Sequence, residues 1–203
     1  CMVRVTWNDI PHIKRVLEAG PDAIVVPMVN SVEEARRAID TCIYPPEGKR
    51  GFGPCRAVRY GLDSVKDYID QGSKQLVRIL QVETKDAVDA MEEVARIPYV
   101  DGFLIGPMDL SGSVGELTHA VDGKETNRLV DLAIARAHAA GKPIGLSTGS
   151  DSPAELAHWM EKGVDFISAS TDMWSIISSA QRLLGDMRRV SEEHPRKQWG
   201  KSE

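Results

Sequence analysis

Two stretches decide the fold: residues 76–84 read LVRILQVET, and residues 101–111 read DGFLIGPMDLS. Each is a short, almost wholly apolar run that ends in a polar motif. Runs of this kind are typical of parallel strands that are covered on both faces. Four further apolar runs occur at residues 2–5, 23–26, 143–146 and 165–169. The sequence therefore predicts six largely buried strands.

Longer segments with the apolar spacing of amphipathic helices separate these runs. We predict helices at residues 10–19, 31–42, 85–97, 126–140, 153–162 and 173–190. Ser31 and Glu34 have the spacing of a capping box, and Gly20, Gly141 and Gly163 follow the ends of helical patterns. Strand–helix alternation of this kind predicts a parallel α/β sheet built from right-handed βαβ units.

Two architectures fit this alternation, an open doubly wound sheet and a closed barrel. No GxGxxG or GxxxxGK[ST] motif follows the first strand, so a nucleotide-binding open sheet has no positive support. Polar residues instead gather at or just past the strand ends, where a barrel places its active site. They are Arg4, Pro27, Glu83, residues 107–109 and Ser147.

The number of units is the second observation. Six units are present, whereas a complete (β/α)8 TIM barrel needs eight and takes about 250 residues. We therefore predict a barrel domain at residues 1–190 that lacks its first two βα units, followed by a polar tail at residues 191–203.

Composition limits the class of partner. The chain has 203 residues and a formal charge of −5, which argues against nucleic acid, because phosphate binding needs a basic face. No apolar run reaches the ~18 residues of a membrane span, and no basic-then-apolar leader opens the chain. The three cysteines form no CxxC pair, so a reducing, cytoplasmic setting fits best.

Glu83 and Asp109 are the strongest candidates for chemistry. Taken singly, Glu83 also fits a helix cap or first turn, and Asp109 also fits an Asx-turn or cap. Taken together, they follow successive parallel strands, which lie about 5 Å apart. Two carboxylates that close repel each other unless one takes up a proton or both share a cation. Oxygen ligands favour Mg²⁺ or Mn²⁺, with Co²⁺ as a third candidate.

Arginines offer positive charge in two places. Arg4, near the end of the first strand, is suited to a substrate carboxylate or carbonyl, or to a salt bridge with a nearby acid such as Glu83 or Asp9. The long Gly/Pro loop at residues 44–54 and the residues after it carry Arg50, Arg56 and Arg59. This cluster suits an anionic substrate end or a subunit contact, although a solvated charge cluster is the default interpretation. The five histidines are scattered, and we expect none to be catalytic.

These motifs resemble the HpcH/HpaI aldolase family, the class II pyruvate aldolases. The matching strings are VRV at residues 3–5, AIVVPM at 23–28, YPPEGKRGFG at 44–53, LQVET at 80–84, DGFLIGPMDLS at 101–111 and GKPIGL at 141–146. The likeness covers nearly the whole chain. It implies a barrel of the phosphoenolpyruvate/pyruvate type that forms homo-oligomers, trimers or hexamers, with a terminal helix exchanged between subunits.

The resemblance also implies a role for each matching residue. Glu83 and Asp109 would bind the divalent metal, and Arg4 would contact the 2-oxo group and stabilise the enolate. Met108 and Asp109 would offer backbone N–H groups to the substrate carboxylate. Gly106 and Pro107 belong to the same substrate-binding motif, and Gln81 and Leu146 would line the pocket.

The implied reaction is metal-dependent aldol cleavage or condensation of 4-hydroxy-2-oxo acids through a pyruvate enolate, with a 2-oxo acid and an aldehyde as partners. The resemblance further implies a proton-transfer histidine in two preceding strands, so we expect these 203 residues alone to be inactive. Three alternatives remain: macrophomate-synthase-like decarboxylation of oxaloacetate with enolate addition, a coenzyme A-ester lyase of the citrate or malyl lyase type, and an inactive truncated homologue.

Overall fold

All six predicted strands form one parallel sheet. The computed structural model describes residues 1–195. The strands are β1 (Met2–Arg4), β2 (Ala23–Val26), β3 (Val77–Val82), β4 (Gly102–Ile105), β5 (Ile144–Ser147) and β6 (Phe166–Ser168). They pair in chain order, and every pair is parallel. The prediction of six consecutive units is confirmed, and β1 and β6 are the two edges of the sheet.

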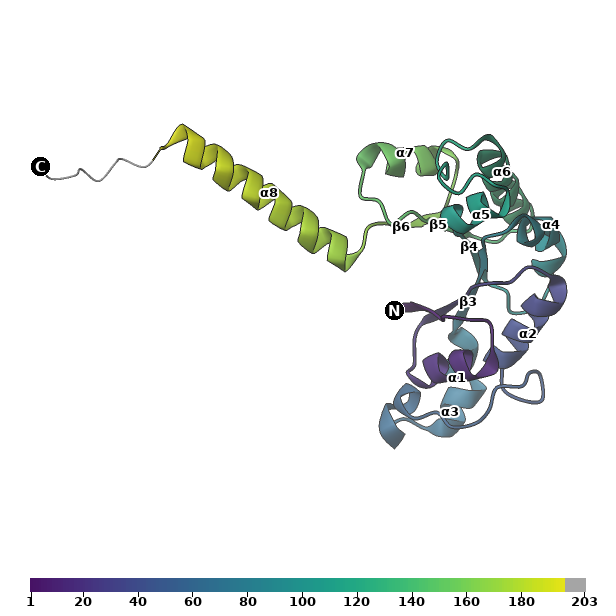
Figure 1. Ribbon diagram of the computed structural model, residues 1–203. Helices are drawn as coiled ribbons and strands as arrows, with labels where there is room; N and C mark the ends of the chain where they lie inside the picture. The colour runs from purple at the N-terminus through teal and green to yellow at the C-terminus, as the bar shows by residue number, and fades with distance from the viewer. Residues whose placement is uncertain (196–203) are drawn as a thin grey trace, which may run out of the picture.

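The six predicted helices also form. They are α1 (Ile10–Glu18), α2 (Val32–Cys42), α4 (Lys85–Val94), α6 (Lys124–Ala139), α7 (Pro153–Glu161) and α8 (Asp172–Glu193). Ser31 caps α2 as predicted, because its Oγ accepts the Glu34 N–H at 3.2 Å. Thr84, which was not predicted as a cap, starts α4 in the same way, with its Oγ1 accepting the Ala87 N–H at 3.1 Å. Figure 1 shows α1, α2, α4 and α6 along the outer side of the curled sheet.

Four short elements were not predicted. They are η1 (Arg56–Gly61), α3 (Val65–Asp70), η2 (Gly72–Gln75) and α5 (Pro107–Ser113). The first three fill the long connection between α2 and β3. The fourth, α5, follows β4 directly and belongs to the end of the sheet where polar residues were predicted to gather.

The two faces of the sheet differ in how they are covered. The large core, which includes Ile24, Leu80, Ile105 and Trp159, lies between the sheet and the helices. The opposite, inner face holds only a small cluster, in which Phe166 packs against Val25, Ile79 and Leu104. Successive strand residues point to opposite faces, so each residue's place in the strand decides which environment it meets.

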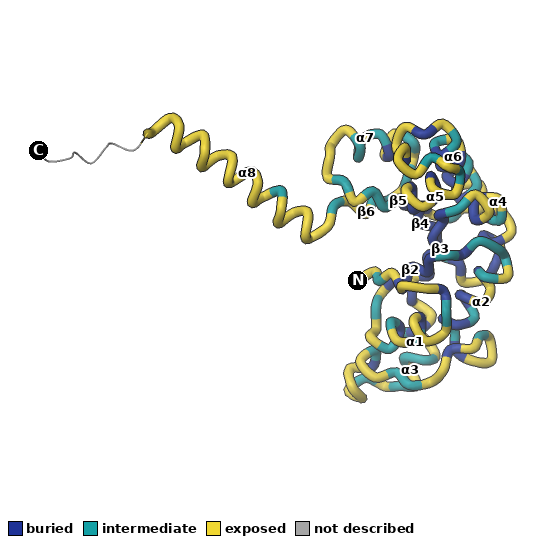
Figure 2. The backbone as a smooth tube through the Cα atoms, in the orientation of Figure 1, coloured by how far each residue is buried: buried dark blue, intermediate teal, exposed yellow. Residues whose placement is uncertain are grey.

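The C-terminal helix α8 has no buried residue (Figure 2). The predicted tail began at Ser191, but Ser191–Glu193 are part of this helix, and residues 196–203 lie outside the described residues. Within residues 1–195, no helix combines the length and the apolar character that a membrane crossing requires.

Candidate active site

The ends of β3 and β4 bring the predicted metal ligands to the same place. Val82 and Ile105, the last residues of the two strands, are paired in the sheet. The backbone N–H of Gly106 then donates to the Val82 carbonyl at 3.0 Å. The chain therefore leaves both strands at the same level, with Glu83 one residue past β3 and Asp109 in the first turn of α5.

Glu83 is buried, with 3% of its surface exposed. It does not cap α4, because Thr84 does. Its Oε1 instead accepts the backbone N–H of Met28, beyond the end of β2, at 2.9 Å. Burial raises the pKa of Glu83, and the charge of Asp109 raises it further, whereas the Met28 hydrogen bond and the charge of Arg4 lower it.

Asp109 is exposed and does not act as the cap that its position also allowed. The N-cap of α5 is Gly106, and no side chain makes a capping hydrogen bond there. The nearby Ser111 hydroxyl donates to the Met108 carbonyl at 2.7 Å, within the helix itself. Asp109 lies in the first turn of α5 and its side chain makes no capping hydrogen bond there.

Gly106 makes room for these groups to meet. A Cβ at this position would lie 2.9 Å from Nε2 of Gln81 and 3.6 Å from Oε2 of Glu83. The buried Oε1 of Gln81 has no hydrogen-bond partner among the described residues. Glycine is therefore required for this close approach of backbone to side chain.

A cavity of about 210 Å³ opens over this group. It is lined by Arg4, Gln81, Leu104, Gly106, Pro107, Met108, Asp109 and Ser147. Arg4 comes from the edge strand β1 and forms no salt bridge with a described residue, so neither Glu83 nor Asp9 pairs with it. Six of the predicted site residues thus line the cavity, and Glu83 lies just behind Gly106.

Leu146 is the predicted pocket residue that the structure places elsewhere. It is completely buried in the core between sheet and helices. The reason is the alternation of side chains along a strand: Gln81 pairs with Leu104, and Leu104 pairs with Gly145, so these residues share the inner face. Leu146 points the opposite way, and its neighbour Ser147 lines the cavity.

Met28 is a site residue that the motif analysis did not assign. Its φ of 55° is in the left-handed region, which side chains other than glycine and asparagine rarely adopt. This conformation accompanies the N–H donation that holds the Glu83 carboxylate. The only signal in the sequence was its place after Pro27 at the end of a buried strand. A backbone N–H donor cannot be recognised from residue type, because every residue except proline has one.

The donor set fits a hard divalent cation. The carboxylates of Glu83 and Asp109 supply oxygen ligands, which Mg²⁺ and Mn²⁺ prefer. A shared cation would also remove the repulsion that raises the pKa of Glu83. No group of three or more His, Cys, Asp or Glu residues converges anywhere in residues 1–195, so the remaining positions would belong to water and substrate.

Comparison with known proteins identifies the family of the chain. The sequence model of the HpcH/HpaI aldolase/citrate lyase family matches residues 1–179. The chain belongs to this family. A 2-dehydro-3,6-dideoxy-6-sulfogluconate aldolase from Pseudomonas putida is 37% identical over an alignment of 187 positions, and the match covers 90% of this chain and 70% of that protein. A hydroxypyruvate/pyruvate aldolase from Roseovarius nubinhibens is 32% identical, over 92% of this chain and 72% of that protein.

A solved structure confirms the architecture. An HpcH/HpaI aldolase/citrate lyase family protein from Burkholderia cenocepacia superposes with a TM-score of 0.84 at 28% identity. The match covers 92% of this chain and 73% of that one. The curled six-stranded sheet of this family member is therefore part of a (β/α)8 barrel, as the alternation of strands and helices predicted. The relatives are aldolases, which are carbon–carbon lyases.

Proposed function

We propose that the chain carries the metal- and substrate-binding half of a class II aldolase that cleaves or forms 4-hydroxy-2-oxo acids through a pyruvate enolate. The observation that supports this most directly is the buried Glu83 beside Asp109 and Arg4 at one end of the sheet. Glu83 and Asp109 would hold Mg²⁺, Mn²⁺ or Co²⁺. When bound, such a cation supplies Lewis acidity that stabilises negative charge on the 2-oxo oxygen.

The remaining residues of the cavity bind and orient the substrate. Arg4 places a permanent positive charge where the oxyanion develops, a contribution often worth about 3–4 kcal/mol. Met108 and Asp109 lie in the first turn of α5, where backbone N–H groups have no acceptor within the helix and can bind the substrate carboxylate. Pro107 has no N–H to offer, and Gln81 offers its amide from the inner face.

Metal binding is the most direct test. Titration of the chain with Mn²⁺ by calorimetry should show one site, and Asp109→Asn should weaken binding at least ~10–100-fold. Asp86→Asn is the matched control, because it removes a carboxylate from the first turn of α4, away from the cavity, and should bind Mn²⁺ normally. Equal Mn²⁺ affinity in wild type and Asp109→Asn would contradict the proposed metal site.

Substrate class requires a separate assay. In a protein that also carries the two preceding βα units, pyruvate release from a 4-hydroxy-2-oxo acid should depend on added metal and stop with a chelator. An acyl-coenzyme A thioester should not be cleaved, because the cavity of about 210 Å³ is small for a nucleotide-bearing substrate. Cleavage of the thioester in preference to the 2-oxo acid would reassign the chain to the citrate lyase type of reaction.

We also propose that the chain forms homo-oligomers through α8. Large apolar side chains occur along this helix in two groups, separated by Ala180, and are exposed: Met173, Ile176 and Ile177, then Leu183, Leu184, Met187 and Val190. An apolar face of this length needs a partner, and a second copy is the occupant that the resemblance implies. Sedimentation should show a trimer or hexamer, and Leu183→Glu should shift it towards monomer, whereas the polar-face control Arg182→Glu should not.

A further inference from the structure

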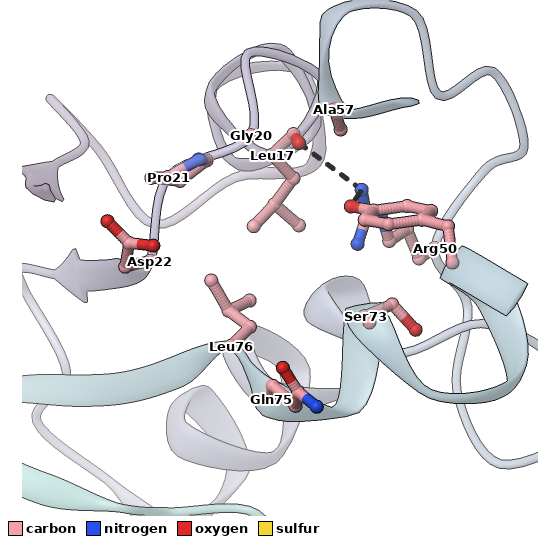
Figure 3. Close-up of a pocket in the computed structure, with 11 residues that line it drawn as sticks. Leu17, Gly20, Pro21, Asp22, Arg50, Ala57, Ser73, Gln75 and Leu76 are labelled. Atoms are coloured by element: carbon pink, nitrogen blue, oxygen red, sulfur yellow. Dashed lines mark hydrogen bonds between the residues drawn. The ribbon is translucent and has the colours of Figure 1, made fainter. Parts of the chain in front are cut away.

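A second cavity lies at the opposite end of the sheet from Arg4 and Asp109. It has a volume of about 210 Å³ and is lined by residues that precede β2 and β3, among them Asp22 and Leu76, together with Arg50 and Tyr68 (Figure 3). One ordered water needs only about 10–15 Å³ of such space, so this cavity has room for a ligand.

Arg50 is the unusual residue of this cavity, because it is a buried cation without a carboxylate. Only 2% of its surface is exposed. Its Nη2 donates to the Leu17 carbonyl at 3.3 Å and to the Tyr68 hydroxyl at 2.9 Å, and its guanidinium lies 4.4 Å from the centre of the Tyr44 ring. Its Nε is buried and has no partner, and no described acid forms a salt bridge with it.

Arg78, another buried arginine in this part of the fold, has its charge balanced by a carboxylate. Arg78 is similarly buried, with 3% of its surface exposed. Its guanidinium lies 3.5 Å from the Asp101 carboxylate and also donates to the carbonyls of Leu76 and Ser73. Arg50 has the burial of Arg78 without the anion. A buried charge is costly unless it is paired. Within residues 1–195, the Arg50 cavity therefore lacks the negative charge that would balance its arginine.

We propose that this cavity binds a small anion through a phosphate or carboxylate group held by Arg50. Arg50 lines the cavity, and its planar guanidinium matches the oxygens of either group. The Tyr68 hydroxyl accepts from Arg50 and so retains its own hydrogen for the ligand. Asp22 is the one acid on the wall.

The test is calorimetric titration of the chain at constant ionic strength, once with inorganic phosphate and once with succinate. We expect saturable binding of at least one anion, and the preferred one identifies the ligand class. Arg50→Gln should weaken it at least tenfold and Tyr68→Phe a few-fold. Asp22→Asn should tighten it a few-fold, because a repelling charge is removed. Arg4→Ala is the control for the other cavity and should leave this binding unchanged.

Several results would overturn the proposal. The first is that neither anion binds saturably to the folded wild type. The second is that Arg50→Gln binds the anion as tightly as wild type does. The third is that Arg4→Ala loses the binding while Arg50→Gln keeps it. If Arg50→Gln does not fold, the two milder variants decide the matter. Unchanged affinity in both Tyr68→Phe and Asp22→Asn would place the anion elsewhere and leave Arg50 a purely structural residue.

Discussion

Replacing Glu83 with glutamine should stabilise the metal-free protein at neutral pH. Glu83 is 3% exposed, and burial, with the charge of Asp109, raises the pKa of its carboxyl group above the ordinary value of 4.5. The folded chain therefore holds this proton more tightly than the unfolded chain does. Stability is then greatest at low pH, falls as pH rises from 4.5 through the raised pKa, and stays reduced at pH 7.

The expected gain comes from two opposing contributions. Glutamine removes the buried charge, and each pKa unit by which that charge was disfavoured corresponds to about 1.4 kcal/mol. Its amide oxygen can still accept the Met28 N–H, but a neutral bond is weaker than a charge-assisted one, and the attraction to Arg4 is lost. The net gain should be on the order of 1 kcal/mol, which raises Tm by about 2–4 °C in a domain of this size.

Thermal melts followed by circular dichroism give the measurement, first with EDTA and then with Mn²⁺. The stability difference between Glu83→Gln and wild type should become smaller as pH falls towards 4.5, below the raised pKa of the wild-type carboxyl group. Mn²⁺ at a hundred times its Kd should stabilise wild type by about 2.7 kcal/mol and the variant far less, so the order reverses. Glu33→Gln, the same change at an exposed position, should show neither effect. A less stable metal-free Glu83→Gln, or an equal response to Mn²⁺, would refute the reasoning.

Three further substitutions test the packing and the backbone. Gly145→Val should destabilise the fold by about 1–3 kcal/mol in urea unfolding, because even a Cβ there would lie 2.2 Å from the Phe166 ring; no loss would mean that β6 shifts freely. Gly141→Ala should cost about 1–2 kcal/mol by the same measurement from backbone strain alone, since its φ is 66° and nothing lies near its Cβ. Asp165→Asn should destabilise at pH 7 by less than about 1 kcal/mol, because the Ile144 N–H lowers the pKa of Asp165 below 3.8; thermal melts should show this difference vanish as pH falls through that lowered pKa.

The strands and main helices were predictable because their signals are local. An apolar run such as Ile79–Val82 identifies a buried strand without knowledge of its neighbours, and strand–helix alternation then gives the parallel order. Helix α5 was missed for the opposite reason. It has seven residues, too few to show periodicity, and it includes Gly112. Its fit depends on Pro107 at its start and on the burial of Leu110, which is a tertiary contact.

The part of the candidate site that depends only on the order and direction of the strands was predictable. Parallel strands end at the same edge, so Glu83 and Asp109 had to leave the sheet together. Which side chains face inwards depends on register, and a one-residue error moves a residue to the other face. Leu146 illustrates this, because pairing Leu104 with Gly145 puts Ser147 on the inner face instead.

Arg50, Arg56 and Arg59 could not be distinguished from the sequence, but they differ in burial. Arg56 is exposed, and Arg59 is exposed and pairs with Asp63, so the default of a solvated charge cluster describes both. Arg50 differs because its surroundings combine the Tyr44 ring of its own loop with the Leu17 carbonyl and the Tyr68 hydroxyl from two other segments. No local pattern reports such an environment. A cation that the fold encloses without a counter-charge implies a ligand more strongly than its sequence neighbourhood can, because burial makes an unpaired charge costly.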